Sequence, residues 1–239
     1  MRSQRHSVGR IVGGIGALVL GLALVGLGPA LGLGHAPTAH AGSGGGSGGD
    51  TKYVLKVKER TVLAAYQVVA ADGCTVTEVS ITAGEDLSRQ VPAPSTRFGP
   101  ATMAVVTHYN QCTGETLFAG GGFTDQNVSV SIANSLNTAQ LATTIPVTSL
   151  DAPPDSPPTF FVTIPSLAFT ATGPPAHTVQ SQHFNMHGAN LVENLNAARA
   201  PATTEGAVVI GDYATASTAN LLIAEIDNYH SGTTSVSKS

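Results

Sequence analysis

Residues 74–82 read CTVTEVSIT, and polar and apolar side chains alternate along this stretch. Successive side chains of a β-strand point to opposite faces of a sheet, so Val79 and Ile81 share one face while Glu78 and Ser80 share the other. Alternation with a period of two, in a segment rich in β-branched residues, predicts a half-buried strand.

Further short runs of this kind lie along the chain between turn-forming residues. The clearest cover residues 53–57, 65–69, 75–82, 103–109, 128–132, 141–147, 160–171 and 221–228. One stretch, IANSLNTAQLA at 132–142, offers a helix as an alternative to loop and strand, and the GGG at 120–122 indicates a turn or a bulge. Many short strands with little helix predict an all-β fold, a single antiparallel β-sandwich over residues 51–230. The Pro-rich segment 152–158 is the best internal boundary, but one sandwich is favoured over two domains.

The first 41 residues have the layout of a secretory signal peptide. Arg2, Arg5 and Arg10 precede an apolar run at 11–34, and Ala39-His40-Ala41 offers small residues around a cleavage site. The run is also long enough to span a bilayer, so a retained N-terminal anchor is the alternative. Residues 42–50 form a Gly/Ser linker, and we expect 231–239 to be a flexible C-terminal tail. These features predict a secreted, extracellular bacterial protein with no membrane contact after cleavage.

The charge distribution argues against nucleic acid as a partner. The chain has 11 Lys and Arg against 15 Asp and Glu. Between Thr61 and Ser237 the only cationic residues are Arg89, Arg97 and Arg199. Binding to a phosphate backbone requires several clustered Lys or Arg side chains, and residues 61–237 do not provide them.

Most of the remaining positive charge lies in one predicted strand. Lys52, Lys56, Lys58 and Arg60 all have even numbers, so they share one face of an extended segment. This strip could bind an anionic surface, such as a cell-wall polymer or another subunit. The alternative is the solvated face of an edge strand, where lysine discourages unwanted pairing.

Cys74 and Cys112 are the two cysteines of the chain. In an exported protein, a disulfide between them is the default expectation. A cysteine nucleophile would need a nearby base, and only His108 is close in sequence, so the disulfide is favoured.

The sequence lacks the usual catalytic signatures, including G-x-S-x-G, H-E-x-x-H, C-x-x-C and the Walker loop. The best metal candidates are His183 and His187, with His177 or Asp212 as a third ligand and Met186 as a soft one. Two residues four apart on a strand lie about 13 Å from each other, too far for one ion unless a loop folds them together. We therefore expect no cofactor, with a metal ion as the alternative.

Acidic residues supply a second catalytic candidate. Glu225 and Asp227 share one face of a predicted strand, at a spacing compatible with the carboxylate pair of a glycosidase. Alternation alone also gathers polar groups on any half-exposed strand, and the chain has no tryptophan to stack on a sugar. Glu85, Asp86 and Asp125 read as turn residues, with structural calcium as the alternative.

Two stretches, DGCTVTEVSITAGED at 72–86 and VVTHYNQCTGETLFAGGGFTD at 105–125, resemble a group of uncharacterised exported bacterial proteins. That group carries G-C-x-x-T-x-V-x-x-x-A-x-E and a later Y-[DN]-x-C-T-G. The segments LATTIPVTSLD, FTATGPP and ARAPATTEGAVV resemble its closing part, although Ala168-Phe169 stands where a tryptophan often precedes the TG turn. The resemblance implies a secreted all-β domain in which Cys74 pairs with Cys112, and it implies no activity.

Taken together, the residues predict a secreted or cell-surface protein with a non-catalytic binding or structural role. The alternative is a secreted hydrolase, with a metal site assembled around His183 and His187.

Overall fold

The computed structural model describes residues 51–90, 96–186 and 189–237. The described residues all belong to one compact unit. The predicted signal peptide at 1–41 and linker at 42–50 therefore lie outside them. No helix among the described residues is long and apolar enough to cross a membrane.

Strands make up almost all of the described regular structure. Their bounds are β1 (Thr51–Val69), β2 (Thr75–Gln90), β3 (Thr96–Phe98), β4 (Ala101–Asn110), β5 (Glu115–Thr124), β6 (Ser129–Ile132), β7 (Thr138–Ser149), β8 (Phe160–Ala171), β9 (Ala176–Met186), β10 (Ala189–Gly206), β11 (Val208–Ile210), β12 (Ala214–Ala216) and β13 (Leu221–Ser237), with one 3-10 turn, η1 (Thr218–Asn220), before β13.

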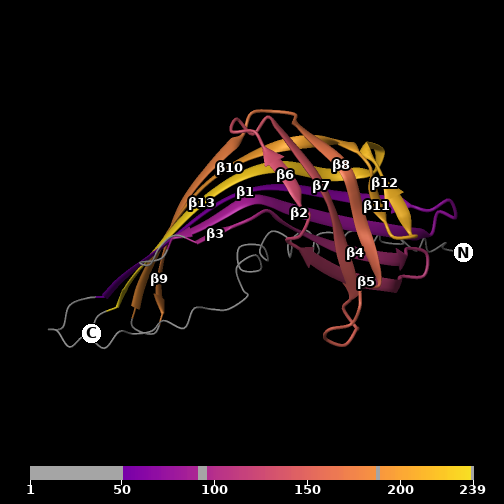
Figure 1. Ribbon diagram of the computed structural model, residues 1–239, viewed down its shortest axis with the longest axis horizontal. Helices are drawn as coiled ribbons and strands as arrows, with labels where there is room; N and C mark the ends of the chain where they lie inside the picture. The colour runs from indigo at the N-terminus through magenta and orange to yellow at the C-terminus, as the bar shows by residue number, and fades with distance from the viewer. Residues whose placement is uncertain (1–50, 91–95, 187–188, 238–239) are drawn as a thin grey trace, which may run out of the picture. The chain divides into compact units, whose positions relative to one another are not determined.

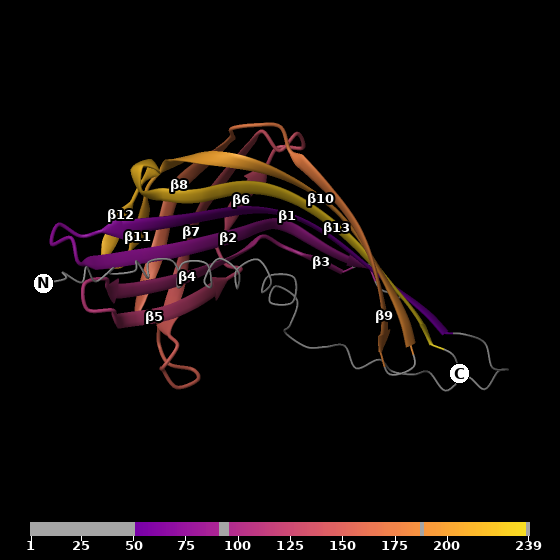
Figure 2. The same cartoon turned by 180° about the vertical axis from the view of Figure 1, so that it is seen from behind.

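The all-β, antiparallel class is confirmed. The hydrogen-bonded order is β12-β11-β8-β10-β13-β1-β2-β4-β5-β7-β6, with β3 on β2 and β9 on β10. Because β7 pairs with both β5 and β8, the sheet closes on itself. The two layers of the predicted sandwich are thus two parts of one curled sheet, in which β7 and β8 cross β1, β2 and β4 (Figures 1 and 2).

The core fills the space between these layers. Val79 and Ile81 of β2 are buried as their alternation predicts, and they belong to the same apolar cluster as Leu141 and Ile145 of β7. The hydroxyl of the buried Tyr66 donates to the hydroxyl of Thr204 at 2.9 Å, so the largest polar group in the core has a partner.

The disulfide between Cys74 and Cys112 is present. It joins two turns whose side chains cap the backbone. Asp72 Oδ1 accepts from the amides of Cys74 and Thr75, and Asn110 Oδ1 accepts from the amide of Cys112. The DGC and N-x-C-T-G motifs are therefore two Asx turns held together by the bridge.

The GGG at 120–122 is not a turn but part of β5, and this corrects the sequence interpretation. A Cβ on Gly122 would lie 1.7 Å from the carbonyl oxygen of Pro146 in β7, and one on Gly120 would lie 2.6 Å from that of Thr148. The glycines let the β7 backbone approach β5 closely enough to close the sheet.

Residues 132–142 take the loop-and-strand alternative, since β6 ends at Ile132 and a turn leads directly into β7. The Pro-rich segment 152–158 connects two paired strands, β7 and β8. Two other expectations require correction. Glu85 and Asp86 lie within β2 rather than in a turn. Residues 231–237, expected in a flexible tail, are the end of β13.

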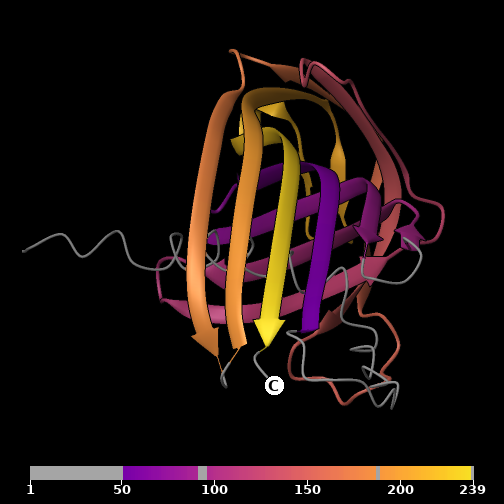
Figure 3. The ribbon, with the colours of Figure 1, turned by 90° about the vertical axis from the view of Figure 1, so that its left-hand side faces the viewer.

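Four strands extend past the core as a ribbon. It consists of β9, residues 189–199 of β10, 228–237 of β13 and 51–60 of β1, in that lateral order. Figure 3 shows these four strands side by side. We call this ribbon the arm.

Candidate functional site

One face of the arm continues the core-facing side of the sheet. Val62 of β1 pairs with Ile226 of β13, which pairs with Ala200 of β10, and all three are fully buried. Arg60 lies two residues before Val62 on β1, on the same face, and with its partner Asn228 it forms the first polar row. The strand side that builds the core therefore becomes hydrophilic where the opposing layer ends.

The register aligns charged and polar residues in rows across this face. Lys58 pairs with His230, and His230 pairs with Asn196. On its other side Lys58 pairs with Ser88, which pairs with Arg97 of β3. Neighbouring strands lie about 4.8 Å apart, so Arg97, Ser88, Lys58 and His230 occupy successive places along one line, with Ser88 between the two cations. We call this surface the cationic face, with basic positions Lys52, Lys56, Lys58, Arg60, Arg97, His177, His183 and His230.

The acids of the arm are confined to one of its two faces. No Asp or Glu occupies a paired position on the cationic face of the arm strands within the described ranges. The acids of the arm, Glu59 and Glu193, occupy register positions of the opposite face, which also carries Arg199 and, just before the arm, Asp227. Anions approaching the cationic face therefore meet no carboxylate on the arm itself.

The described side chains of this face are available to solvent. Lys58, His177, His183 and His230 are exposed. A nitrogen of His230, Nε2, lies 3.1 Å from Asn228 Oδ1 on the same strand. The predicted basic strip on β1 thus lies beside His230 of β13 and shares its face with His177 and His183 of β9, which is separated from β1 by β13 and β10. The side chains of Lys52 and Lys56 lie outside the described set.

Arg60 differs from the rest of the strip because it is held within the molecule. Its Nη1 lies 3.2 Å from Glu85 Oε2 and donates to Asn134 Oδ1 at 3.2 Å. Glu85, at a bulge of β2, also accepts from the amide of Ile132. Arg60, at the end of the cationic face nearest the core, is therefore held by contacts within the protein, whereas Lys58 is exposed to solvent.

The predicted metal site is not assembled within the described part of the chain. There, no group of three or more His, Cys, Asp or Glu side chains could hold a metal ion. His177 and His183 lie on β9, whereas Asp212 lies in the β11–β12 turn. His187 lies outside the described residues, so its relation to His183 stays a prediction.

The predicted pair Glu225 and Asp227 is part of a carboxylate cluster on the opposite face. Arg199 Nε lies 3.3 Å from Glu225 Oε2 and 3.0 Å from Asp227 Oδ1. Burial raises the pKa of Asp227 to about 6, against the opposing effect of Arg199. Burial, with a contribution from Asp227, raises the pKa of Glu59 to about 7.

Two carboxyl groups of this cluster, Glu59 and Asp227, have raised pKa values, and its cation, Arg199, is already ion-paired. Arg199 bridges the pair, and Glu59 Oε1 is buried without a hydrogen-bond partner. Raised pKa values occur both in catalytic sites and in structural clusters. A guanidinium tied to both carboxylates favours a structural role for the pair.

A second candidate constellation is Thr77 with His108. Thr77 Oγ1 lies 2.9 Å from His108 Nδ1, and the His108 ring lies 4.8 Å from that of Tyr213. Phe118 and Phe160 complete an aromatic group on this side of the core. Thr77 is 3% exposed and its hydroxyl is already paired with His108, which favours a structural role for this contact.

Sequence reasoning missed Arg97, His177 and His230 as members of the basic surface. Nothing in the spacing of these residues links them to Lys58, because four different strands carry them. Only the register brings them together. The available signal was the absence of carboxylates at alternate positions of residues 177–185 and 228–236.

Comparisons with known proteins add little to this picture. No family model matches the chain, and no curated protein does. Among solved structures, an acetoacetate decarboxylase-like enzyme from Sphingomonas wittichii RW1 matches with 9% identity, covering 80% of this chain and 93% of that one. The TM-score is 0.25, which supports no inference about activity.

Proposed function

We propose that this chain is an exported, non-catalytic protein that binds an anionic polymer at or beyond the cell surface through the cationic face. The observation that carries the proposal is the confinement of the acids of the arm to one of its two faces. Basic positions from β1, β3, β9 and β13 share one face, and the acids of the arm occupy the other.

The spacing of the basic positions suits a repeating ligand. Lys52, Lys56 and Lys58 share one face of β1, where alternate residues are about 7 Å apart, so Lys56 and Lys58 are separated by one such step and Lys52 and Lys56 by two. Across the strands, His230 is next to Lys58, and Arg97 lies on the far side of Ser88 in the same row. A grid of separated charges matches a chain with regularly placed anions better than a single small anion, which would require converging donors.

Export is supported by the disulfide and by the N-terminal sequence pattern. Cys74 and Cys112 form a bridge of the kind that persists in oxidising compartments. A surface whose charges are exposed gives binding that is fast, reversible and weakened by salt.

The test measures retention on immobilised poly(glycerol phosphate), with uncharged dextran as the blank. We expect retention at low ionic strength and elution as salt rises, because exposed charge contacts are screened. The double variant Lys58→Gln with Arg97→Gln should lose most of the retention.

The matched control is Arg89→Gln. Arg89 is adjacent to Ser88 on β2 and pairs with Val57, so its position belongs to the opposite face. It should bind nearly as the parent protein does. Equal losses for Arg89→Gln and for either single change on the cationic face would show that only net charge matters and would refute the proposal.

A further inference from the structure

One edge of β7 has a stretch with which no described strand pairs. β5 pairs with β7 at Thr148 and Ser149, and β6 pairs with it from Ala139 to Ala142. Between these two partners, no strand pairs with residues 143–147 on that side within the described part of the chain. Pro146 lies in this stretch and has no amide hydrogen to leave unpaired.

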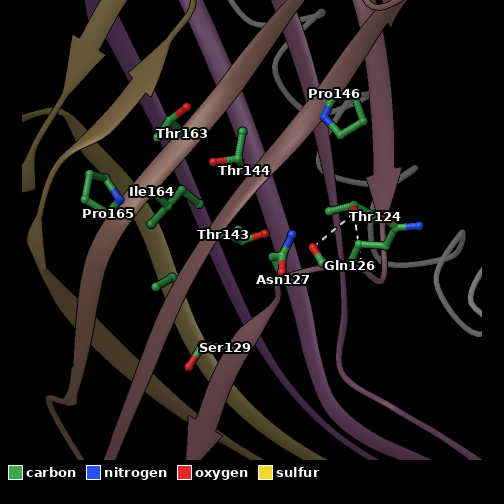
Figure 4. A pocket seen from close by; sticks show the side chains of 11 residues that line it. Thr124, Gln126, Asn127, Ser129, Thr143, Thr144, Pro146, Thr163, Ile164 and Pro165 are labelled. Carbon is green, nitrogen blue, oxygen red and sulfur yellow. Dashed lines mark hydrogen bonds between the residues drawn. The ribbon is translucent and has the colours of Figure 1, made fainter.

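A pocket of about 600 Å³ opens at this gap. Its walls come from β7, β8, the start of β6 and the β5–β6 connection, where Gln126 and Asn127 form the rim (Figure 4). This volume falls within the range of roughly 300–1,000 Å³ that is typical of small-molecule sites.

Thr143 is the anomalous residue of the pocket. Odd-numbered residues of β7 face the core, and Ala139, Leu141, Ile145 and Val147 on this face are all buried and apolar. Thr143 is 6% exposed, and its hydroxyl oxygen is buried with no hydrogen-bond partner. Valine would have the same shape at this position without a hydroxyl to satisfy.

An unpaired buried hydroxyl destabilises the free protein unless another group supplies the missing hydrogen bond. Thr143 lines the pocket, and its hydroxyl points to the side on which Asn127 lies (Figure 4). The oxygen that lacks a partner inside the protein is therefore placed where a bound molecule could supply one.

The lining defines the chemistry of that molecule. It contains hydroxyl groups from Thr124, Ser129, Thr144 and Thr163 besides Thr143, amide groups from Gln126 and Asn127, and no charged residue. Hydroxyls and primary amides both donate and accept, as neighbouring sugar hydroxyls do. Pro146, Pro165 and Ile164 add apolar surface, which suits the C–H faces of a sugar ring.

We propose that this pocket binds one unit of a neutral saccharide, with Thr143 as the buried hydrogen-bonding group and Asn127 at the rim. The proposal does not depend on the cationic face, which lies on other strands and would bind an anionic polymer.

The test is an NMR titration of the full chain with N,N′-diacetylchitobiose, maltose and cellobiose as separate probes. At least one should bind and shift the amide resonances of Thr143, Asn127 and Thr163. Thr143→Val should weaken binding at least tenfold while raising the midpoint of thermal unfolding. Thr143→Ser, which keeps the hydroxyl, should retain most of the binding.

Ser80→Ala is the matched control. Ser80 of β2 also has a buried hydroxyl oxygen without a partner, but it does not line the pocket. This change should leave saccharide binding as it is. The proposal is overturned if no probe shifts these resonances at millimolar concentration, if Thr143→Val binds as tightly as the parent, or if a neutral peptide such as acetyl-trialanine amide binds more tightly than every saccharide.

Discussion

Glu59 should impose a pH-dependent cost on folding that glutamine removes. This side chain is 8% exposed, and its Oε1 atom has no hydrogen-bond partner. Burial, assisted by the negative charge of Asp227, raises its pKa from 4.5 to about 7. A pKa raised in the folded state means that the folded protein holds this proton more tightly than the unfolded chain does.

The sign and size of the effect follow from that difference. Below pH 4.5 the carboxyl is protonated in both states and costs nothing extra. As pH rises toward 7, the unfolded chain releases the proton more readily, so the free energy of unfolding falls. A difference of about 2.5 pKa units, at 1.36 kcal/mol each, amounts to about 3 kcal/mol, reached above pH 7.

The assay is urea unfolding of the parent protein and of Glu59→Gln at pH 4 and pH 8. The variant should gain about 3 kcal/mol relative to the parent at pH 8 compared with pH 4. Glu115→Gln, the same change at an exposed position, should show no such gain. Parallel changes in unfolding free energy for the parent and Glu59→Gln between the two pH values would refute the reasoning.

Two further predictions concern closure of the fold. Replacing both Cys74 and Cys112 with serine should lower the free energy of unfolding by about 4 kcal/mol in the chain-entropy model, because the bridge spans a sequence separation of 38. Equal denaturation midpoints for the parent and the double variant would contradict this prediction. Gly122→Ala should prevent β5 and β7 from pairing, because the added Cβ would lie 1.7 Å from the carbonyl oxygen of Pro146. Circular dichroism and thermal unfolding would report the loss. The control Gly99→Ala, with open space around the new Cβ, should behave as the parent does.

The sequence predicts the strands that alternate and misses those that do not. In β2, Val79 and Ile81 mark one face clearly, so both the strand and its buried side follow from the pattern. β9 reads AHTVQSQHFNM, and its described side chains are all exposed. A strand that buries little has no apolar period to detect, because backbone pairing with β10 rather than core packing holds it in place.

The prediction of a turn or bulge at residues 120–122 was wrong for a different reason. Gly120 and Gly122 indicate a turn when read locally, since glycine is common there. Their role depends on Pro146 and Thr148, which approach them from a strand more than twenty residues away. A close approach between backbones leaves no local trace other than the missing side chains.

The candidate site was predictable only in part. Lys52, Lys56 and Lys58 share a face because they lie on one strand, and this follows from alternation alone. Arg97 and His230 join them through pairing partners that a single sequence does not specify. The sequence alone shows Thr143 as a threonine within an alternating apolar run. The pocket beside it could not be predicted, because it depends on where the pairing of β5 and β6 with β7 ends.

The three long strands of the arm also determine how it responds to force. β1, β10 and β13 pass from the closed part of the sheet into the arm without a break, so none of these three strands has a loop there that could act as a hinge. A pull on the arm tip directed along these strands would load their many lateral hydrogen bonds together, in shear, instead of opening them one after another. A protein tethered to a polymer through this ribbon would transmit tension directly into its core and resist being peeled apart.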